Sequence, residues 1–428
     1  MTKRILFVGM VDSPHTARWI NQVSDLGWDL HIFPVYHAPA HRLLKGVTVH
    51  RPWLQIRPRF LLKQFLSNPR NAFNLRNSLR EAHPNKLEVR SVLPLPAVGP
   101  LEQILAGIQS EPLGESDVRA PLFYGPHVLA RLIRKLKPDL IHSMEFQHAG
   151  YLTLRAKELS RSKPFPKWLA TNWGSDIYYY RNFPDHKKQI TRLLSEIDYY
   201  SCECERDVEL AREMGLTAPV LPVMPNTGGF DIEQIEILRE GASPSERRII
   251  MVKGYEHFAG RALTALDAVA MCADVLRGYR VVVFSASTVV RERVEELRMF
   301  HGLDISILEH AGHDKMLKYF AHARAYLGVS VSDAISTSML EAMALGSFPI
   351  QTDSSCCSEW IQHGRTGFSV RADDVRDIAA KLRIAVTDDN LVNDAEEMNW
   401  QTVLERLDQR KLKPQAERFY EFVLPQSV

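Results

Sequence analysis

The chain has 428 residues, of which 45% are hydrophobic and 24% are charged. These fractions are typical of folded proteins, and they exclude a disordered chain, a collagen or a coiled coil as the main architecture. At roughly 150 residues per domain, the length predicts two or three domains. The 53 Lys and Arg residues stand against 51 Asp and Glu residues, and the net charge of +2 argues against a dedicated nucleic-acid binder.

Targeting and redox features point to the cytoplasm. No apolar run approaches the roughly 18 residues needed to span a bilayer. The apolar stretch after Lys3 and Arg4 stops at Gly9, so it is too short for the core of a signal peptide. The five cysteines are an odd number and lack the Cys-x-x-Cys spacing of zinc ligands. We therefore expect a cytoplasmic protein with neither a disulfide framework nor a zinc site.

The N-terminal half alternates short apolar runs with helical patterns. Residues 5–8 predict a buried strand, which is followed by a loop, by a helix around residues 17–23 and by a second strand at 30–34. Further strands are expected at 138–142, 167–171 and 199–202. Strands separated by helices predict a parallel, doubly wound sheet.

The pattern begins again after residues 222–229, which are rich in Pro and Gly. A strand at 248–252 leads to a helix from about Gly260, and the final helical pattern covers residues 416–423. Further strands are expected at 281–284, 305–308, 325–329 and 348–351.

The predicted fold class is therefore α/β, with two Rossmann-like domains facing a central cleft. We expect domains at residues 1–225 and 226–410, and a helix within 411–428 that packs back on the first domain. Ligands of such sheets bind beyond the carboxyl ends of the strands, so the loops at those ends are expected to carry the chemistry.

The sharpest local pattern is the segment 330–346, which follows a strand and opens a helix. Its helix start is favourable for an anion, because free amide groups and the helix dipole meet there. Two carboxylates, Asp333 and Glu341, lie eight positions apart around this start and are suited to accept hydrogen bonds from sugar hydroxyls. The spacing fits a capped helix with two solvated acids equally well. The anion-binding turn is predicted to comprise Ser336, Thr337, Ser338, Met339 and Leu340.

The run from Asp333 to Glu341, followed by Ala-Met-Ala and Gly346, resembles the carboxylate motif of retaining glycosyltransferases of family 4, which have the GT-B fold. The downstream segments 348–353 and 359–367 fit the same family. The resemblance implies that Glu341 holds the nucleotide ribose and that Asp333 lies near hydroxyls of the donor sugar. The family usually has Glu at the first position, so Asp333 is one methylene shorter.

A second cluster, residues 251–261, is also a strand, a glycine-bearing loop and a helix start. Lys253 and Arg261 flank the loop, where they either clamp a diphosphate as charge develops on the leaving group or are two surface cations. The family has a basic pair here at shorter spacing. The sequence lacks an Asp-x-Asp pair, so we expect no metal and no cofactor, with a nucleotide diphosphate sugar as co-substrate. A UDP-sugar is expected ahead of a GDP-sugar.

The first domain is expected to bind the acceptor through loops after its strands. Gly9 and His15 belong to the first of these loops. In the segment 142–148 the family often carries a histidine that contacts the donor sugar, and by resemblance His148 or Glu145 takes this role, with a structural histidine equally open. Asp176 ends a segment that resembles Thr-x-His-Gly-x-Asp. It either orients an acceptor hydroxyl or caps the following helix.

Residues 41–90 carry eleven Lys and Arg against two Glu, a local charge of +9, interleaved with apolar side chains that include Trp53, Phe60, Phe65 and Leu66. Such a segment suits an anionic membrane surface, and acceptors of the family are often lipid-linked. Solvated cations are the alternative. No nucleic-acid-binding motif accompanies the segment. We expect a basic insertion at about 41–125 and an enzyme peripheral to the inner face of the cell membrane.

Together these patterns predict a hexosyltransferase-type glycosyltransferase that moves a sugar from a nucleotide diphosphate to a hydroxyl of a glycan or lipid-linked acceptor. Retention is implied by the resemblance, as is a role in cell-surface polysaccharide or glycoconjugate synthesis. A GT-B nucleotide-sugar epimerase and a non-catalytic nucleotide-sugar-binding protein are the alternatives. A dehydrogenase and a P-loop NTPase are disfavoured, because neither glycine-rich motif is present.

Overall fold

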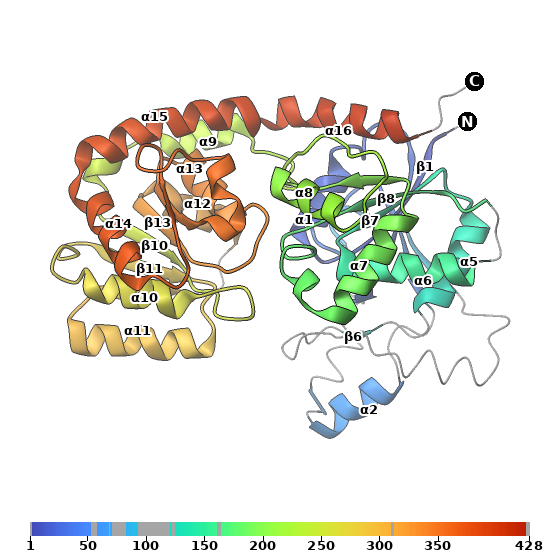
Figure 1. The fold of residues 1–428 in the computed structure, drawn as a ribbon, viewed down its shortest axis with the longest axis horizontal. Coiled ribbons are helices and arrows are strands. Elements are labelled where there is room, and N and C mark those ends of the chain that lie inside the picture. The colour runs from blue at the N-terminus through green and yellow to red at the C-terminus, as the bar shows by residue number, and fades with distance from the viewer. Residues whose placement is uncertain are drawn as a thin grey trace. The chain divides into compact units, whose positions relative to one another are not determined.

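The computed structural model describes residues 2–52, 58–67, 69–70, 83–92, 120–121, 125–160, 164–309 and 312–424. The chain divides into two compact units (Figure 1). The N-terminal unit comprises Met1–Gly228 with Lys413–Val428, and the C-terminal unit comprises Gly229–Leu412.

The N-terminal unit is built on a sheet of parallel strands in the order β5-β4-β2-β1-β7-β8-β9. Alternate residues of the central strand β1 serve opposite faces. Leu6 and Val8 join the core beneath the helices α5 (Gly125–Leu136), α6 (Tyr151–Leu159) and α7 (Pro184–Glu196). The ring of Phe7 contacts the ring of Tyr420 in the C-terminal helix α16 (Gln409–Val423). The strands are β1 (Arg4–Gly9), β2 (Asp29–Pro34), β4 (Thr48–Pro52), β5 (Val89–Val92), β7 (Leu140–Met144), β8 (Lys167–Thr171) and β9 (Tyr199–Ser201), with an antiparallel pair β3 (Tyr36–His37) and β6 (Ala120–Pro121) beside them.

Helices cover both faces of this sheet (Figure 1). The first of them begins at Ser13, whose hydroxyl accepts the amide hydrogens of His15 at 3.2 Å and Thr16 at 3.5 Å, the usual way to satisfy a helix start. The helices are α1 (Pro14–Asn21), α2 (Pro58–Ser67), α5 (Gly125–Leu136), η1 (Phe146–Gly150), α6 (Tyr151–Leu159), η2 (Tyr180–Asn182), α7 (Pro184–Glu196), α8 (Glu205–Glu213) and α16 (Gln409–Val423).

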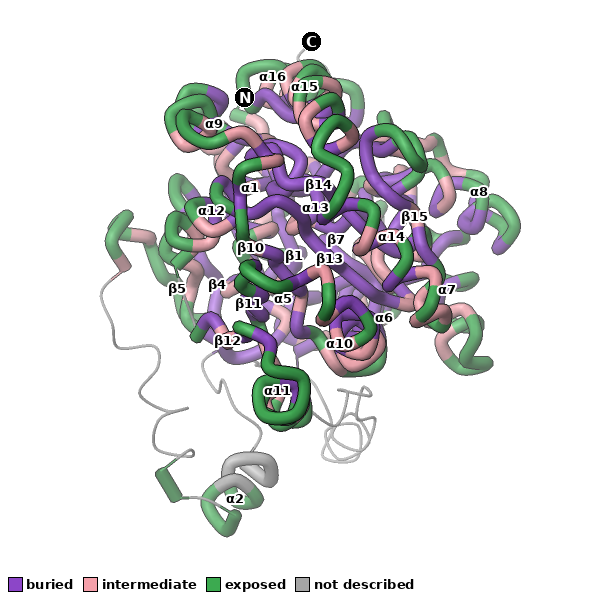
Figure 2. The backbone as a smooth tube through the Cα atoms, turned by 90° about the vertical axis from the view of Figure 1, so that its left-hand side faces the viewer, coloured by how far each residue is buried: buried purple, intermediate pink, exposed green. Residues whose placement is uncertain are grey.

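The C-terminal unit has a parallel sheet in the order β12-β11-β10-β13-β14-β15. In Figure 2 the strands are almost wholly buried, and exposed residues gather on outer helices such as α11. Its strands are β10 (Ile249–Lys253), β11 (Arg280–Phe284), β12 (Ile305–Leu308), β13 (Ala323–Gly328), β14 (Phe348–Thr352) and β15 (Phe368–Val370). Its helices are α9 (Ile232–Arg239), η3 (Pro244–Glu246), α10 (Ala262–Met271), α11 (Thr288–His301), α12 (His313–Ala321), α13 (Thr337–Ala344), η4 (Asp353–Ser355), η5 (Cys357–Glu359), α14 (Val375–Thr387) and α15 (Asp389–Arg406).

The predicted pair of parallel α/β sheets is confirmed, with one difference inside the segment 41–125, which the sequence analysis treated as an insertion. The strands β4 and β5 lie in this segment and extend the N-terminal sheet. Their sequences, Thr-Val-His-Arg-Pro and Val-Arg-Ser-Val, lack a continuous apolar run, so hydrophobic periodicity does not mark them. None of the described helices is both long enough and apolar enough to cross a bilayer.

The C-terminal helix α16 is joined to the N-terminal sheet through the buried side chain of Tyr420. Its hydroxyl accepts a hydrogen bond from Trp19 Nε1 at 2.7 Å and lies 2.7 Å from His142 Nδ1. The other nitrogen of His142 lies 2.6 Å from Thr171 Oγ1. Burial lowers the pKa of His142 to about 3, so the imidazole is neutral at neutral pH and has one donor and one acceptor for these two partners. His142 is therefore a core residue.

We expect Tyr420→Phe to lower the free energy of unfolding by about 1–3 kcal/mol, because a buried donor and acceptor lose their partner while the ring is kept. Urea denaturation measures the change. Tyr199→Phe is the control, since this half-buried tyrosine makes a ring contact near the same end of α16. If the two variants are equally stable, the buried network contributes nothing to folding.

Candidate active site

Backbone pairing brings together the two clusters that the sequence singled out in the C-terminal unit. The Arg261 amide donates to the Val329 carbonyl at 3.0 Å, and the Val331 amide donates to the Ala259 carbonyl at 2.7 Å. Gly260 lies where a Cβ would come within 2.2 Å of the Tyr255 carbonyl oxygen, so only glycine fits this turn. The loop after β10 is thereby held against the segment after β13.

This pairing sets the Lys253 ammonium beside a carboxylate. Lys253 Nζ lies 3.9 Å from Asp333 Oδ2 and 4.7 Å from the centre of the Tyr255 ring. Burial opposes the charged ammonium, yet the neighbouring Tyr326 and Asp333 outweigh it and hold the pKa of Lys253 above its usual value. The site thus keeps a positive charge at the carboxyl end of β10.

The start of α13 lies in the same chain segment as Asp333. The Met339 and Leu340 amides donate to the Ser336 carbonyl at 3.0 and 3.1 Å. The Thr337 and Ser338 amides donate to no other residue in the described part of the chain. The Ser336 hydroxyl does not cap the helix and lies 3.3 Å from the Tyr326 hydroxyl instead. The first turn therefore offers two amide donors to an anion.

Glu341 has a partner that the sequence analysis did not identify. Its side chain is 8% exposed, and its Oε1 lies 2.7 Å from Nε2 of His313, the first residue of α12. The available signal was a histidine directly after a glycine, but the two residues lie 28 positions apart in the chain, which hides the contact.

Tyr326 is a second residue that the sequence analysis did not identify. This fully buried tyrosine of β13 donates to Gln351 Oε1 at 3.1 Å, and burial raises the pKa of its hydroxyl. A Cβ on Gly328 would lie 2.3 Å from the same hydroxyl oxygen, so Gly328 leaves room for the phenol. The side chain of Tyr326 thus fills the space beside Lys253 and Ser336.

Arg261 is oriented toward its own loop. Its Nη1 donates to the Gly260 carbonyl at 2.6 Å and to the His257 carbonyl at 2.9 Å. Part of the guanidinium is thus used to stabilise the turn that pairs with β13. Contact between Arg261 and a diphosphate remains a prediction.

The candidates in the N-terminal unit gather at the carboxyl ends of β1, β7 and β8, with Gly9 at the end of β1 and the ring of His15 6.0 Å from that of Trp173. Glu145 is buried and has a φ of +80°, a conformation that is strained for this residue type. Its Oε1 accepts the amide hydrogens of Ala149 and of His148, the latter at 2.8 Å. Its Oε2 lies 3.2 Å from His148 Nδ1, so the carboxylate orients the imidazole.

Asp176 serves the backbone. Its Oδ2 accepts the amide hydrogens of Phe146 and Trp173, both at 2.8 Å. Burial raises the pKa of Asp176 well above its usual value, and the nearby Glu145 adds to the shift. Neither amide belongs to a helix that follows Asp176, so these bonds are not the helix cap that the sequence left open. The carboxyl group instead ties the loops after β7 and β8 together, and a role toward the acceptor remains a prediction.

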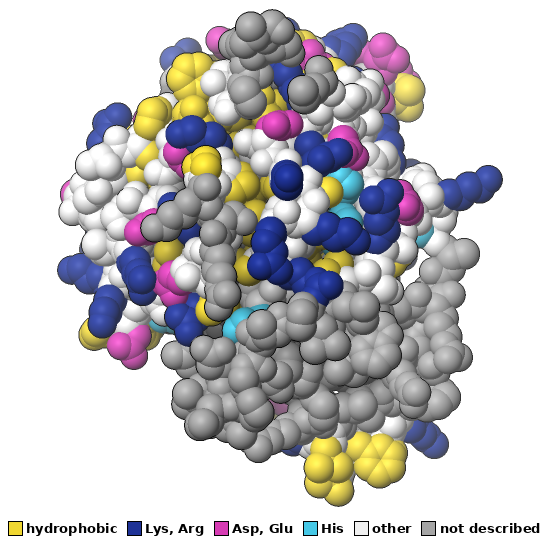
Figure 3. All heavy atoms as spheres, turned by 90° about the vertical axis from the view of Figure 1, so that its right-hand side faces the viewer, with side chains coloured by type: hydrophobic (Ala, Val, Ile, Leu, Met, Phe, Trp, Pro, Cys, Tyr) yellow, Lys and Arg dark blue, Asp and Glu magenta, His cyan; other side chains and the backbone are white. Residues whose placement is uncertain are grey.

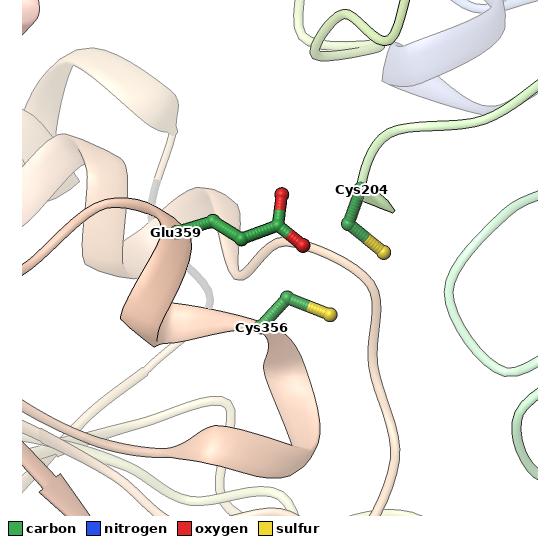
Figure 4. Close-up of side chains that lie close together, drawn as sticks. All are labelled: Cys204, Cys356 and Glu359. Carbon is green, nitrogen blue, oxygen red and sulfur yellow. The ribbon is translucent and has the colours of Figure 1, made fainter. Parts of the chain in front are cut away.

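The five cysteines are buried, and none is joined to another by a disulfide bond in the structure. Figure 4 shows Cys356 and Glu359, whose side chains project from the η4–η5 turn of the C-terminal unit, and Cys204, which precedes α8 in the N-terminal unit.

Comparison with known proteins assigns the class of protein. Residues 247–388 match the family model "Glycosyl transferases group 1", and residues 64–202 match "Glycosyl transferase 4-like". No protein of curated function matches the sequence. The chain therefore belongs to the glycosyltransferases, with a group 1 domain in its C-terminal unit and a 4-like domain in its N-terminal unit.

Solved structures agree with this fold. The chain is similar to sucrose-phosphate synthase from Thermosynechococcus elongatus (12% identity, 98% of this chain and 99% of that chain, TM-score 0.67). It is also similar to HepE from Anabaena in complex with UDP and glucose (14% identity, 98% and 100%, TM-score 0.62). A third is a TarM mutant from S. aureus (9% identity, 98% and 100%, TM-score 0.62). At these identities the likeness shows the GT-B fold, as predicted.

Replacing Asp176 by Ala should lower the free energy of unfolding by about 1–3 kcal/mol, because two buried amide groups lose their acceptor. Chemical denaturation tests this, with the exposed Asp185→Ala in α7 as the control. A variant as stable as the wild type would show instead that the fold does not need this carboxyl group. The alternative, in which Asp176 orients a hydroxyl of the acceptor substrate, would then be favoured.

Proposed function

We propose that this glycosyltransferase moves a hexose from a nucleoside diphosphate to a hydroxyl of a glycan or lipid-linked acceptor, with retention at the anomeric carbon, in the synthesis of cell-surface polysaccharide or glycoconjugates. The observation that carries the proposal is the placement of Lys253 beside Asp333, in the segment that leads into a helix start with two open amides. A uridine diphosphate donor is supported by the HepE structures, whose complexes contain UDP and UDP-glucose.

In this proposal the C-terminal unit handles the donor. The bond between the anomeric carbon and the diphosphate oxygen breaks, a bond to the acceptor oxygen forms, and the acceptor proton leaves with the products. Lys253 and the Thr337 and Ser338 amides stabilise the charge that develops on the departing diphosphate, which removes the need for a metal ion. Arg261, from the same loop as Lys253, supplies a second positive charge that stabilises the departing diphosphate.

The carboxylates bind hydroxyl groups in the same proposal. Glu341 accepts hydrogen bonds from the ribose, and Asp333 accepts them from the donor sugar. In the N-terminal unit, the loop bearing Gly9 and His15 binds the acceptor, and His148, oriented by Glu145, contacts the reacting sugar. These groups act mainly by positioning, which by itself contributes a large part of the rate in such transfers.

The donor site is tested by measuring kcat/KM of the wild type and of Lys253→Met across a screen of UDP- and GDP-sugars. We expect the substitution to reduce kcat/KM by about 100-fold, the scale for loss of one group that stabilises developing charge. Lys315→Met, an exposed lysine on α12, is the matched control. Turnover should persist in chelator.

Three outcomes would contradict parts of this proposal. Equal kcat/KM for Lys253→Met and wild type would remove Lys253 from the site. Loss of activity in chelator that manganese restores would contradict metal independence. Release of free nucleotide and an altered sugar without acceptor would identify an epimerase, which measurement of both products separates from transfer.

We also propose that the N-terminal unit docks on an anionic membrane through α2. Leu62, Phe65 and Leu66 of this helix are 59%, 57% and 76% exposed, and Lys63 is exposed beside them. Figure 3 shows hydrophobic side chains at the lower edge, where α2 lies, and a group of Lys and Arg side chains higher on the same face. Apolar residues with nearby cations suit the interface of an anionic bilayer. Several residues of the basic segment, including Trp53, Arg57, Arg76, Arg80 and Glu81, lie outside the described residues.

Liposome flotation tests the docking. We expect the protein to float with vesicles containing phosphatidylglycerol, and the double substitution Phe65→Ser with Leu66→Ser to abolish this, since two of the three apolar side chains described as exposed on this helix are removed. Phe300→Ser on α11, which is 79% exposed, is the control. Equal partitioning into neutral vesicles would contradict the electrostatic part of the proposal.

A further inference from the structure

The contact between His313 and Glu341 lies within the C-terminal unit and has no assigned role. His313 begins α12, and Glu341 belongs to α13, so the contact joins two helices that follow different strands. The atoms His313 Nε2 and Glu341 Oε1 are 2.7 Å apart, a short distance typical of a charge-assisted hydrogen bond. An ionised carboxylate only accepts hydrogen bonds, so Nε2 carries the proton.

Glu341 depends on this bond for its orientation. Its side chain is 8% exposed, and across the described ranges its carboxylate takes a hydrogen bond from His313 alone. A nearly buried carboxylate that loses its hydrogen-bond donor raises the free energy of the folded protein, so the side chain moves toward another partner. The available cation is Lys253, which already feels the charge of Glu341.

Such a movement would disturb the site twice. The carboxylate would leave the position set by His313, and Lys253 would gain a competing partner in addition to Asp333, which lies 3.9 Å from its ammonium. The His313 bond uses Oε1 and leaves Oε2 for a ligand hydroxyl. The arrangement therefore separates the carboxylate that binds hydroxyls from the ammonium that binds phosphate.

We propose that His313 is a positioning residue that holds Glu341 for the ribose hydroxyls of the nucleotide and so sets the preference of this enzyme for ribonucleotides over deoxyribonucleotides. This inference rests on the proposed function, in which Glu341 receives the ribose.

The test compares the affinity of UDP with that of 2′,3′-dideoxy-UDP by titration calorimetry, or the corresponding guanosine pair if GDP binds more tightly. In the wild type we expect UDP to bind about 10- to 100-fold more tightly, the equivalent of one hydrogen bond to a charged group. In His313→Ala this preference should fall below about threefold. His313→Gln places an amide donor near the same position and should restore it.

His301→Ala is the matched control, because His301 is an exposed histidine at the end of α11 in the same unit. It should keep the wild-type preference. If His313→Ala weakens both nucleotides by the same factor, or leaves the preference unchanged, His313 does not position Glu341 for the ribose and the inference is overturned. If neither UDP nor GDP binds the wild-type protein, the proposed function fails, and this result is distinct from the first.

Discussion

The donor side of this protein depends on one backbone interaction, the pairing of the loop after β10 with the segment after β13. These strands are neighbours in the sheet although 69 residues of chain separate Lys253 from Ala323, and the strand order reverses its direction between them. The crevice that forms at such a point is where open α/β sheets bind ligands. The bonds from Arg261 and Val331 fix the loop there, and Gly260 allows the close approach.

Charge is arranged around that pairing in a way that suits a diphosphate with attached hydroxyl groups. The Lys253 ammonium and the open amides of α13 supply the positive part, while Asp333 and Glu341 supply hydrogen-bond acceptors. These opposite charges would neutralise each other if they were free to meet. Asp333 lies at 3.9 Å from the ammonium, beyond a close ion pair, and Glu341 is held by His313. The site therefore keeps both kinds of group available.

The N-terminal unit is constrained differently, because it holds polar side chains at the buried ends of its strands. Glu145 adopts a positive φ and binds the start of the π-helix η1, and Asp176 binds two backbone amides from the loops after β7 and β8. Both carboxyl groups are buried, so each must be paired with donors. The strain at Glu145 is tolerated because its carboxylate satisfies η1 and orients His148.

The amino-acid sequence by itself determined the class of fold, because buried parallel strands such as β1 and β10 are continuous apolar runs whose period and breakers are local properties. It also identified Asp333, Glu341 and Lys253 as candidates, since a strand, a loop and a helix start place them at strand ends. It could not show β4 and β5, because they lack a continuous apolar run and become strands by pairing with neighbours in the sheet. Only the tertiary structure decided that Asp176 supports the backbone, that Arg261 turns to its own loop, and that His313 holds Glu341. These roles are set by hydrogen bonds between groups far apart in the chain, and such bonds depend on side-chain direction, which sequence spacing does not specify.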